Sequence, residues 1–203
     1  MMKLYYAPGA CSLSPHIALR EAGLPFTLIK VSTKTKEIEG GGDFRAINPK
    51  GYVPALELDQ GGVLTEGPAI VQYIADQVPA SGLAPANGTL ARYRVQEWLN
   101  FVSTELHKQF SPLFDPTTPD EVKTKQRERI GGRLEWVASQ LGDKPYLTGE
   151  SFTVADAYLF VILNWAKPMG IDLARWPAVK AFHERVAARP KVQEALKAEG
   201  LVR

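Results

Sequence analysis

A single cysteine, Cys11, is the residue of this 203-residue chain best suited to nucleophilic or redox chemistry. It lies in the stretch LYYAPGACSLSPH, between a turn-forming Pro-Gly pair and a Ser-Pro pair that favours the start of a helix. A thiol at such a junction meets the amides of the first helical turn, whose partial positive charge stabilises a thiolate over a thiol. A lone cysteine is more often a small buried side chain, but this setting predicts an active-site group.

The same stretch also contains the pattern Cys-x-x-Ser, a redox motif whose second thiol is missing. Such a site can hold a mixed disulfide, but it cannot resolve that disulfide without a thiol from elsewhere. Thiol-disulfide exchange is therefore one hypothesis that the motif leaves open.

Two further stretches offer groups that could hold a peptide-like ligand. In GYVPALEL, a cis peptide between Val53 and Pro54 would turn the Val53 main chain outward to pair with an extended peptide, although only about one in twenty X-Pro bonds is cis. In TEGPAI, Glu66 and Gly67 lie where a helix begins, so free amides could receive a carboxylate and Glu66 an ammonium group. Helix capping alone is the alternative explanation for the second stretch.

The region from residue 89 to 110 predicts a helix with two distinct stripes. An apolar stripe at helical spacing indicates the core face, and it consists of Val95, Leu99, Val102, Leu106 and Phe110. The neighbouring stripe is polar but uncharged, and it consists of Asn100, Thr104, His107 and Ser111. Because a solvated face usually carries Lys and Glu, this second stripe indicates a cleft or an interface, with an ordinary helix flank as the alternative.

The residue pattern around these candidate groups predicts an α+β domain followed by a helical domain. Residues 1–80 predict a βαβ unit followed by a ββα unit, residues 81–88 predict a linker, and residues 89–203 predict an all-α helical bundle. The expected strands are 3–7, 26–31, 55–58 and 63–65; the expected helices are 14–23, 68–78, 89–110, 119–141, 153–167 and 177–189. Thr153 and Asp156 predict a capping box, to which we assign no catalysis.

Composition excludes several classes of function. The net charge of +2, from 24 basic and 22 acidic residues, comes with mixed signs along the chain, so no basic stripe indicates nucleic-acid binding. One cysteine and three histidines allow neither an internal disulfide nor a Cys/His metal cluster at a usual spacing. No apolar run is long enough to span a membrane, and no secretory signal is evident, so we expect a cytoplasmic protein.

Taken together, the motifs resemble those of the glutathione transferases, specifically the bacterial beta class. The resemblance covers essentially the whole chain, and its carriers are YYAPGACSLSPHIALREAGLPF, INPKGYVPALEL, LTEGPAIVQYIADQ, EWLNFVSTELHKQFSPLF, FTVADAYLF and ARPKVQEALKAEGL. It implies a thioredoxin-like domain joined to a helical domain, a homodimer, and glutathione as co-substrate in the first domain.

Position by position, the resemblance implies that Cys11 lies beside the glutathione sulfur and that Val53, before cis-Pro54, pairs with the cysteinyl main chain. Glu66 and Gly67 would hold the γ-glutamyl end. The remaining implied contacts are Lys36 on the glycyl carboxylate and Asn100, Thr104, His107 and Trp165 from the helical domain. The resemblance gives Tyr5 and Tyr6 no catalytic role.

The predicted function is conjugation of the glutathione thiolate to an electrophilic, apolar substrate. Ser12, His107 and the helix amides are the candidates for holding the thiolate. Two alternatives stay open: a glutathione-dependent thiol-disulfide oxidoreductase or peroxidase that uses Cys11, and a non-catalytic ligand-binding dimer. The second substrate and the physiological role, whether detoxification, dehalogenation or redox defence, do not follow from the sequence.

Overall fold

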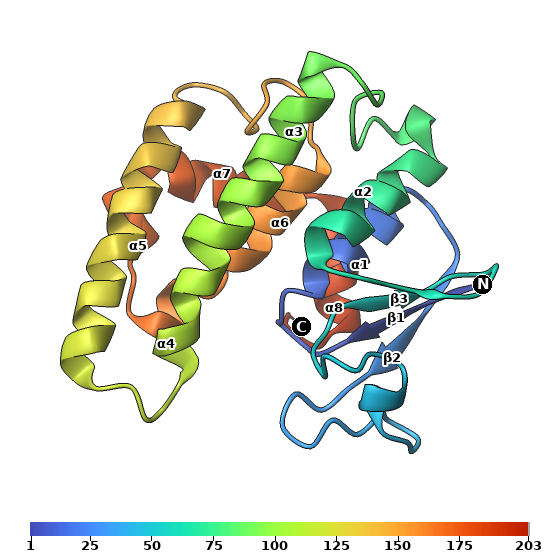
Figure 1. Cartoon of the computed structure of the whole chain (residues 1–203). Helices are drawn as coiled ribbons and strands as arrows, with labels where there is room; N and C mark the ends of the chain where they lie inside the picture. The colour runs from blue at the N-terminus through green and yellow to red at the C-terminus, as the bar shows by residue number, and fades with distance from the viewer. Residues whose placement is uncertain (203) are drawn as a thin grey trace. The chain divides into compact units, whose positions relative to one another are not determined.

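The structure, a computed structural model, describes residues 1–202 and divides into two compact units (Figure 1). The first unit comprises Met1–Ala84 together with the chain from Arg189 onward, and the second comprises Pro85–Ala188. The predicted helical domain extends to residue 203, whereas the second unit of the structure ends at Ala188. The C-terminal segment returns to the first unit because its helix buries an apolar face there.

A mixed four-stranded sheet with the order β2-β1-β3-β4 forms the centre of the first unit. Its strands are β1 (Met2–Tyr6), β2 (Phe26–Lys30), β3 (Ala55–Glu57) and β4 (Val63–Thr65). β1 runs parallel to β2 and antiparallel to β3, and β3 is antiparallel to β4. Helix α1 (Leu13–Glu21) connects β1 to β2, and α2 (Gly67–Gln77) follows β4. The predicted βαβ-ββα order and the thioredoxin-like class are confirmed.

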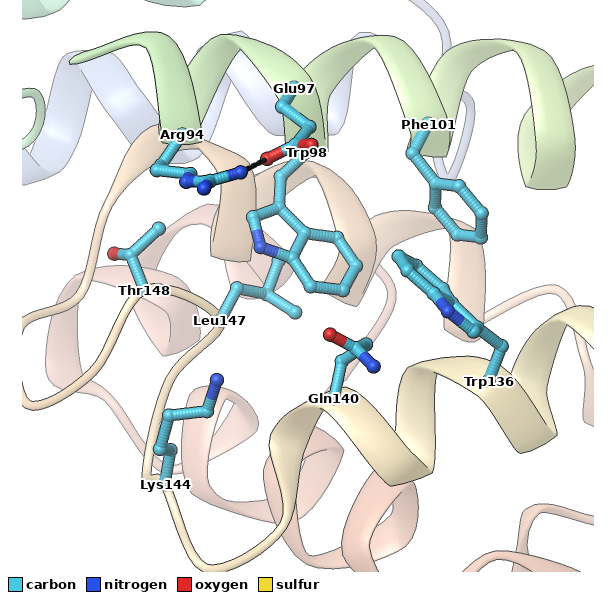
Figure 2. A pocket seen from close by; sticks show the side chains of 9 residues that line it. All are labelled: Arg94, Glu97, Trp98, Phe101, Trp136, Gln140, Lys144, Leu147 and Thr148. Carbon is cyan, nitrogen blue, oxygen red and sulfur yellow. Dashed lines mark hydrogen bonds and ion pairs between the residues drawn. The ribbon is translucent and has the colours of Figure 1, made fainter. Parts of the chain in front are cut away.

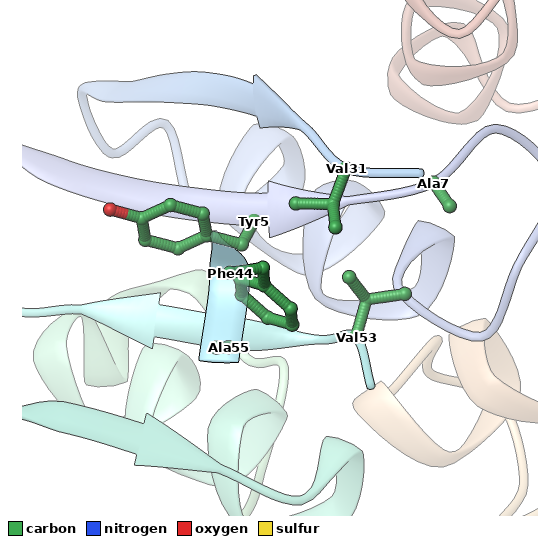
Figure 3. Close-up of a cluster of buried hydrophobic side chains, with 6 residues drawn as sticks. All are labelled: Tyr5, Ala7, Val31, Phe44, Val53 and Ala55. Carbon is green, nitrogen blue, oxygen red and sulfur yellow. The ribbon is translucent and has the colours of Figure 1, made fainter. Parts of the chain in front are cut away.

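The two faces of the sheet bury different clusters. Side chains alternate along a strand, so the paired residues Leu4 and Leu56 face one side and the paired residues Tyr5 and Ala55 face the other. Phe44 covers the second side, with its ring centroid 5.5 Å from that of Tyr5. Val53 joins this cluster directly before β3, as Figure 3 shows. The segment that carries the predicted ligand-binding main chain is therefore anchored in the core.

Helix α8 (Pro190–Ala198), which the sequence analysis did not predict, packs against α1 in the first unit. Its buried face consists of Val192, Ala195 and Leu196. Arg189, just before it, forms a bidentate ion pair with Glu21 at 2.7 and 2.9 Å. Pro190 marks the end of the preceding helix, but a proline is also favoured in a first helical turn, and here it begins α8.

The second unit is helical, as predicted. Its helices are α3 (Leu90–Phe101), α4 (Ser111–Phe114), α5 (Asp120–Leu141), α6 (Val154–Leu163) and α7 (Pro177–Ala187). Every residue of α6 is buried, which makes it the central helix of this unit. The predicted capping box begins it, because the Asp156 carboxylate accepts from the Thr153 amide at 2.7 Å. Within residues 1–202, no helix is long and apolar enough to cross a membrane.

The predicted helix of residues 89–110 is not continuous. It passes from α3 into a π-helical turn (Val102–Leu106) and then into a 3-10 turn (His107–Phe110). The five predicted core positions are buried, which confirms the apolar stripe. A π turn contains more residues than an α turn, so it rotates the residues that follow it around the helix axis. His107 is thereby turned away from the predicted polar stripe toward the interior of the unit.

Candidate functional site

Cys11 lies directly before α1, and its thiol is partly accessible. Its Sγ donates to the main-chain carbonyl of Val53 at 3.5 Å, which joins two predicted site residues that are 42 positions apart. The Val53-Pro54 peptide is cis. The structure thus brings together the predicted thiol and the predicted ligand-binding main chain.

Ser12 occupies a different position from the one expected of a group that holds a ligand's thiolate. It is fully buried. Its hydroxyl donates to the Ala7 carbonyl at 3.2 Å and lies 3.1 Å from the Ala7 amide, which donates to it. Ser12 therefore closes the turn between β1 and α1 from the inside and is not available to a ligand in solvent.

Lys36 and Glu66 share an unusual main-chain conformation. Within residues 1–202 they are the only non-glycine residues with positive φ, at 66° and 70°. Such conformations are unfavourable for side-chain-bearing residues and concentrate at functional sites. Both residues were predicted to bind the ligand, and both lie outside the apolar core.

Each of these two residues already has a partner. The Lys36 ammonium donates to the Thr33 carbonyl at 2.6 Å, and Glu66 forms an ion pair with Lys50. Lys50 was missed by the sequence analysis, although it lies in the stretch INPKGYVP. Gly67 begins α2 directly after Glu66, so its amide lies at a helix start.

The predicted residues of the helical unit fall into two groups. Asn100 and Thr104 are exposed, and the Thr104 hydroxyl donates to the Asn100 carbonyl at 3.0 Å. His107 is mostly buried, with Nδ1 2.6 Å from the Tyr158 hydroxyl and its ring 5.0 Å from that of Trp165. Burial lowers the pKa of His107 from 6.5 to about 4, with a smaller effect of the Lys108 charge. His107 is therefore a neutral imidazole at pH 7.

The two tyrosines of β1 both have raised pKa values. Burial, together with a hydrogen bond to Glu57 at 2.8 Å, raises the pKa of Tyr5 to about 12. The pKa of Tyr6 is also raised, first by burial and then by the nearby charge of Glu199. This agrees with the absence of a catalytic role for either tyrosine in the sequence analysis.

A pocket of about 390 Å³ in the helical unit has none of the predicted site residues in its lining (Figure 2). Aromatic rings line one side, where the centroids of Phe101 and Trp136 are 4.4 Å apart. Arg94, at the rim, is paired with Glu97 at 2.8 Å. In the part of the chain that the structure describes, no group of three or more His, Cys, Asp or Glu side chains could hold a metal ion.

Two family models match this chain. Residues 9–77 match the glutathione S-transferase N-terminal domain, and residues 101–190 match the glutathione S-transferase C-terminal domain. Together these matches cover most of both predicted domains. The chain belongs to the glutathione S-transferase family. The sequence-based assignment to this family is confirmed.

Individual glutathione S-transferases resemble the chain over nearly its full length. Glutathione S-transferase GstA of Escherichia coli O157:H7 is 50% identical over 200 residues, which cover 98% of this chain and 100% of the relative. The structure of BphK, a bacterial glutathione S-transferase in a ternary complex, has a TM-score of 0.96 and 59% identity, covering 98% of this chain and 100% of BphK. A sphingomonad glutathione S-transferase complexed with glutathione has a TM-score of 0.95 and 51% identity, with the same coverage.

These relatives support transferase chemistry over the two alternatives left open by the sequence. The chain is a glutathione transferase, and glutathione is its co-substrate. The likeness extends through both units, so the sequence prediction of fold and of enzyme class is confirmed.

Proposed function

We propose that glutathione binds in the first unit with its sulfur beside Cys11 and its cysteinyl main chain paired with Val53. The observation that carries this proposal is the contact of 3.5 Å between the Cys11 thiol and the Val53 carbonyl. That carbonyl accepts from the Cys11 thiol, and a ligand amide can replace the thiol as its donor. Binding of glutathione and release of the Cys11 thiol are then one exchange of hydrogen bonds.

The two ends of glutathione carry different charged groups and need different partners. Its γ-glutamyl end has an ammonium and a carboxylate group, for which Glu66 and the Gly67 amide at the start of α2 are the complementary partners. Its glycyl carboxylate would form an ion pair with the Lys36 ammonium. Glu66 leaves Lys50 and Lys36 leaves Thr33 when the ligand arrives. Breaking the Glu66–Lys50 pair costs little because surface ion pairs contribute little by themselves, so the new bonds to the ligand add to affinity.

The strained main chain at Lys36 and Glu66 supports this assignment. Both residues hold positive φ, and the fold retains a conformation that glycine would adopt with less strain. A glycine at either position would lack the charged group. The strain is therefore consistent with a requirement for the side chain itself.

For the helical unit, we propose that His107 and Trp165 contribute to the site, with Asn100 and Thr104 as further polar contacts. Because His107 is neutral and its Nδ1 faces Tyr158, the imidazole acts as a hydrogen-bonding group and not as a cation. Phe110 and Phe114 pack against Trp165 with ring centroids 5.7 and 5.3 Å away. Such an aromatic surface suits an apolar electrophile.

In the reaction, the glutathione thiol loses its proton to solvent, and the thiolate attacks an electrophilic carbon. A carbon-sulfur bond forms, and the leaving group departs with the electron pair of the bond that breaks. Lowering the pKa of a thiol from about 8.5 to about 6.5 raises ionisation at pH 7 roughly 25-fold, but a Brønsted slope near 0.45 makes the thiolate about eightfold less reactive. The net gain of about threefold leaves positioning of both reactants as the larger contribution.

We also propose that the protein is a beta-class enzyme, a homodimer and cytoplasmic. Cys11 at the start of α1 supports membership of the bacterial beta class. The resemblance on which this rests also implies a homodimer, and a single reduced cysteine suits the cytoplasm. Sedimentation of the purified chain at micromolar concentration tests the dimer directly.

Calorimetric titration with glutathione tests the proposed site. We expect wild-type protein to bind glutathione and Glu66→Gln to bind it roughly tenfold more weakly, because a charged hydrogen bond to the ligand ammonium is lost. Glu37→Gln is the matched control, because Glu37 is another exposed acidic residue of the same unit. Equal affinities for Glu66→Gln and wild type would overturn the assignment of the γ-glutamyl end.

The role of Cys11 is tested by conjugation of 1-chloro-2,4-dinitrobenzene, followed in wild type and in Cys11→Ala. We expect a reduced kcat in the variant, since the thiol lies at the place proposed for the glutathione sulfur. Intact conjugation would show that Cys11 is not essential. Hydroxyethyl disulfide reduction by the same proteins measures any redox activity of the thiol separately.

A further inference from the structure

A buried polar cluster joins the C-terminal segment to α1. Glu199, the residue after α8, has Oε1 2.8 Å from His16 Nδ1, and both side chains are fully buried. Arg20 donates from Nε to His16 Nε2 at 2.8 Å. An arginine N–H can only donate, so Nε2 is the accepting nitrogen, and Nδ1 carries the ring proton toward Glu199. His16 thus joins the Arg20 guanidinium to the Glu199 carboxylate through its two ring nitrogens.

The second carboxylate oxygen of Glu199 reaches the turn that carries Cys11. Oε2 accepts from the Gly9 amide at 3.0 Å, two residues before the thiol. Gly9 has φ of +70°, and Leu201 Cδ2 lies 3.4 Å from the position that a Cβ on Gly9 would occupy. Glu199 therefore bonds to this turn directly, and Leu201 lies near enough to it that a side chain on Gly9 would touch Leu201.

Stability alone is a weak explanation for this cluster. Removing a carboxylate from water is unfavourable, and apolar residues of similar volume often serve a protein interior equally well or better. What an apolar pair could not provide is an acceptor for the Gly9 amide. The Glu199 carboxylate provides this acceptor at the turn before Cys11.

We propose that Glu199 is a positioning residue for Cys11, because its bond to the Gly9 amide fixes the turn that presents the thiol to the Val53 carbonyl. The buried Ser12 hydroxyl closes the same turn from its other side through Ala7. The proposal rests on the proposed function, in which Cys11 lies beside the glutathione sulfur. His16 orients the Glu199 carboxylate, and Arg20, which donates to His16, supplies the compensating positive charge.

Glu199→Gln tests this role, because it replaces one of the two carboxylate oxygens by an NH2 group, which cannot accept from His16 Nδ1 or from the Gly9 amide. Two quantities are measured in each protein: glutathione affinity by calorimetry, and the rate of Cys11 alkylation by iodoacetamide as a function of pH. Cys11 is the only cysteine, so alkylation reports on it alone. We expect glutathione affinity to fall at least roughly tenfold and the alkylation profile to shift along the pH axis.

Glu21→Gln is the matched control. It weakens the ion pair with Arg189, which also joins the C-terminal segment to α1, but at the end of that helix opposite to Cys11. We expect both readouts to stay within about twofold of wild type, because distant sites contribute independently. Equal shifts in the two variants, or an unchanged alkylation profile in Glu199→Gln, would overturn the positioning role.

A double variant covers the case in which Glu199→Gln does not fold. His16→Leu/Glu199→Met replaces the buried pair by apolar side chains, a change that is often neutral or stabilising, yet it leaves the Gly9 amide without its acceptor. We expect the same shift of the alkylation profile, and a wild-type profile in a folded double variant overturns the proposal. Failure of wild type to bind glutathione overturns the proposed function instead, while alkylation still decides the role of Glu199.

Discussion

The proposed ligand contacts of the first unit and two buried polar side chains of the helical unit are held in opposite ways. In the first unit the proposed ligand contacts are main-chain groups and exposed charges: the Val53 carbonyl, the Gly67 amide, and the side chains of Lys36 and Glu66 on a strained main chain. In the helical unit the prominent polar side chains, His107 and Asp156, lie among apolar neighbours, and burial shifts the pKa of each.

This difference separates binding from stability. Changes to exposed charges on a strained main chain alter ligand affinity while leaving the core intact. Changes to buried titratable groups alter folding and its pH dependence. Four predictions test whether binding and stability depend on different residues, and they proceed from the largest expected effect to the smallest.

The largest effect is expected from Asp156→Ala in the helical unit. The Asp156 carboxylate accepts from the Leu147 amide at 2.8 Å and from the Thr153 amide and hydroxyl at 2.7 and 2.9 Å, all buried. Alanine leaves these donors unsatisfied, so we expect the free energy of unfolding to fall by about 3 kcal/mol. Urea unfolding measures the change.

Asp172→Ala provides the control for Asp156→Ala. Asp172 also caps a helical turn in this unit, accepting from the Ala174 amide at 2.9 Å, but it is exposed. Its replacement is expected to cost about 1 kcal/mol or less. Equal losses in the two variants would contradict the importance of burial, and a large loss of glutathione affinity at temperatures where Asp156→Ala is folded would contradict the separation of the units.

The second effect concerns pH and His107. Because burial lowers the pKa of His107 to about 4, the unfolded chain binds a proton between pH 6.5 and 4 that the native protein does not. The His107 contribution to stability is therefore present above pH 6.5 and lost as the pH falls toward 4. Burial raises the pKa of Asp156 to about 6, so its contribution has the opposite sign and is lost as the pH rises through 6.

His107→Gln removes one of these opposing contributions. We expect the variant to gain stability relative to wild type as the pH falls from 6.5 to 4.5, by roughly 2 kcal/mol, a value reduced from full linkage because solvent reaches part of the ring. Urea midpoints at four pH values between 4.5 and 7.5 measure the difference. Parallel curves for the two proteins would show that His107 is not held neutral by the fold.

The sequence predicted the order of elements in both units because strands, turns and helix starts leave local signals. Alternating apolar residues, glycine pairs and the Thr153–Asp156 box are such signals. The burial of Glu199 and the pairing of Lys50 depend on distant segments, and their residue types are those of an ordinary surface. The inward turn of His107 depends on the π turn before it, which a period of 3.6 residues cannot reveal.

The third effect is a gain in stability with a loss of binding, predicted for Glu66→Gly in the first unit. Glycine has no Cβ and tolerates φ of 70° and ψ of 113° with less strain than glutamate, so we expect the free energy of unfolding to rise by at most about 1 kcal/mol. Glutathione affinity should fall roughly tenfold with the charge. Glu66→Gln is the comparison, since it keeps the strain and removes only the charge; it should lose affinity without gaining stability. A stability gain in both variants would exclude strain as its origin.

The smallest effect is expected from Tyr5→Phe, which asks whether a phenol of the first unit assists the thiolate. The pKa of about 12 and the hydrogen bond to Glu57 mean that the Tyr5 hydroxyl keeps its proton and directs it away from any ligand. We therefore expect kcat for 1-chloro-2,4-dinitrobenzene to stay within about twofold of wild type, because a group that does not touch the reacting atoms contributes little to the transition state. Cys11→Ala, measured in parallel, should show the larger change. A collapse of kcat in Tyr5→Phe with glutathione affinity preserved would transfer the role of holding the thiolate from the start of α1 to β1.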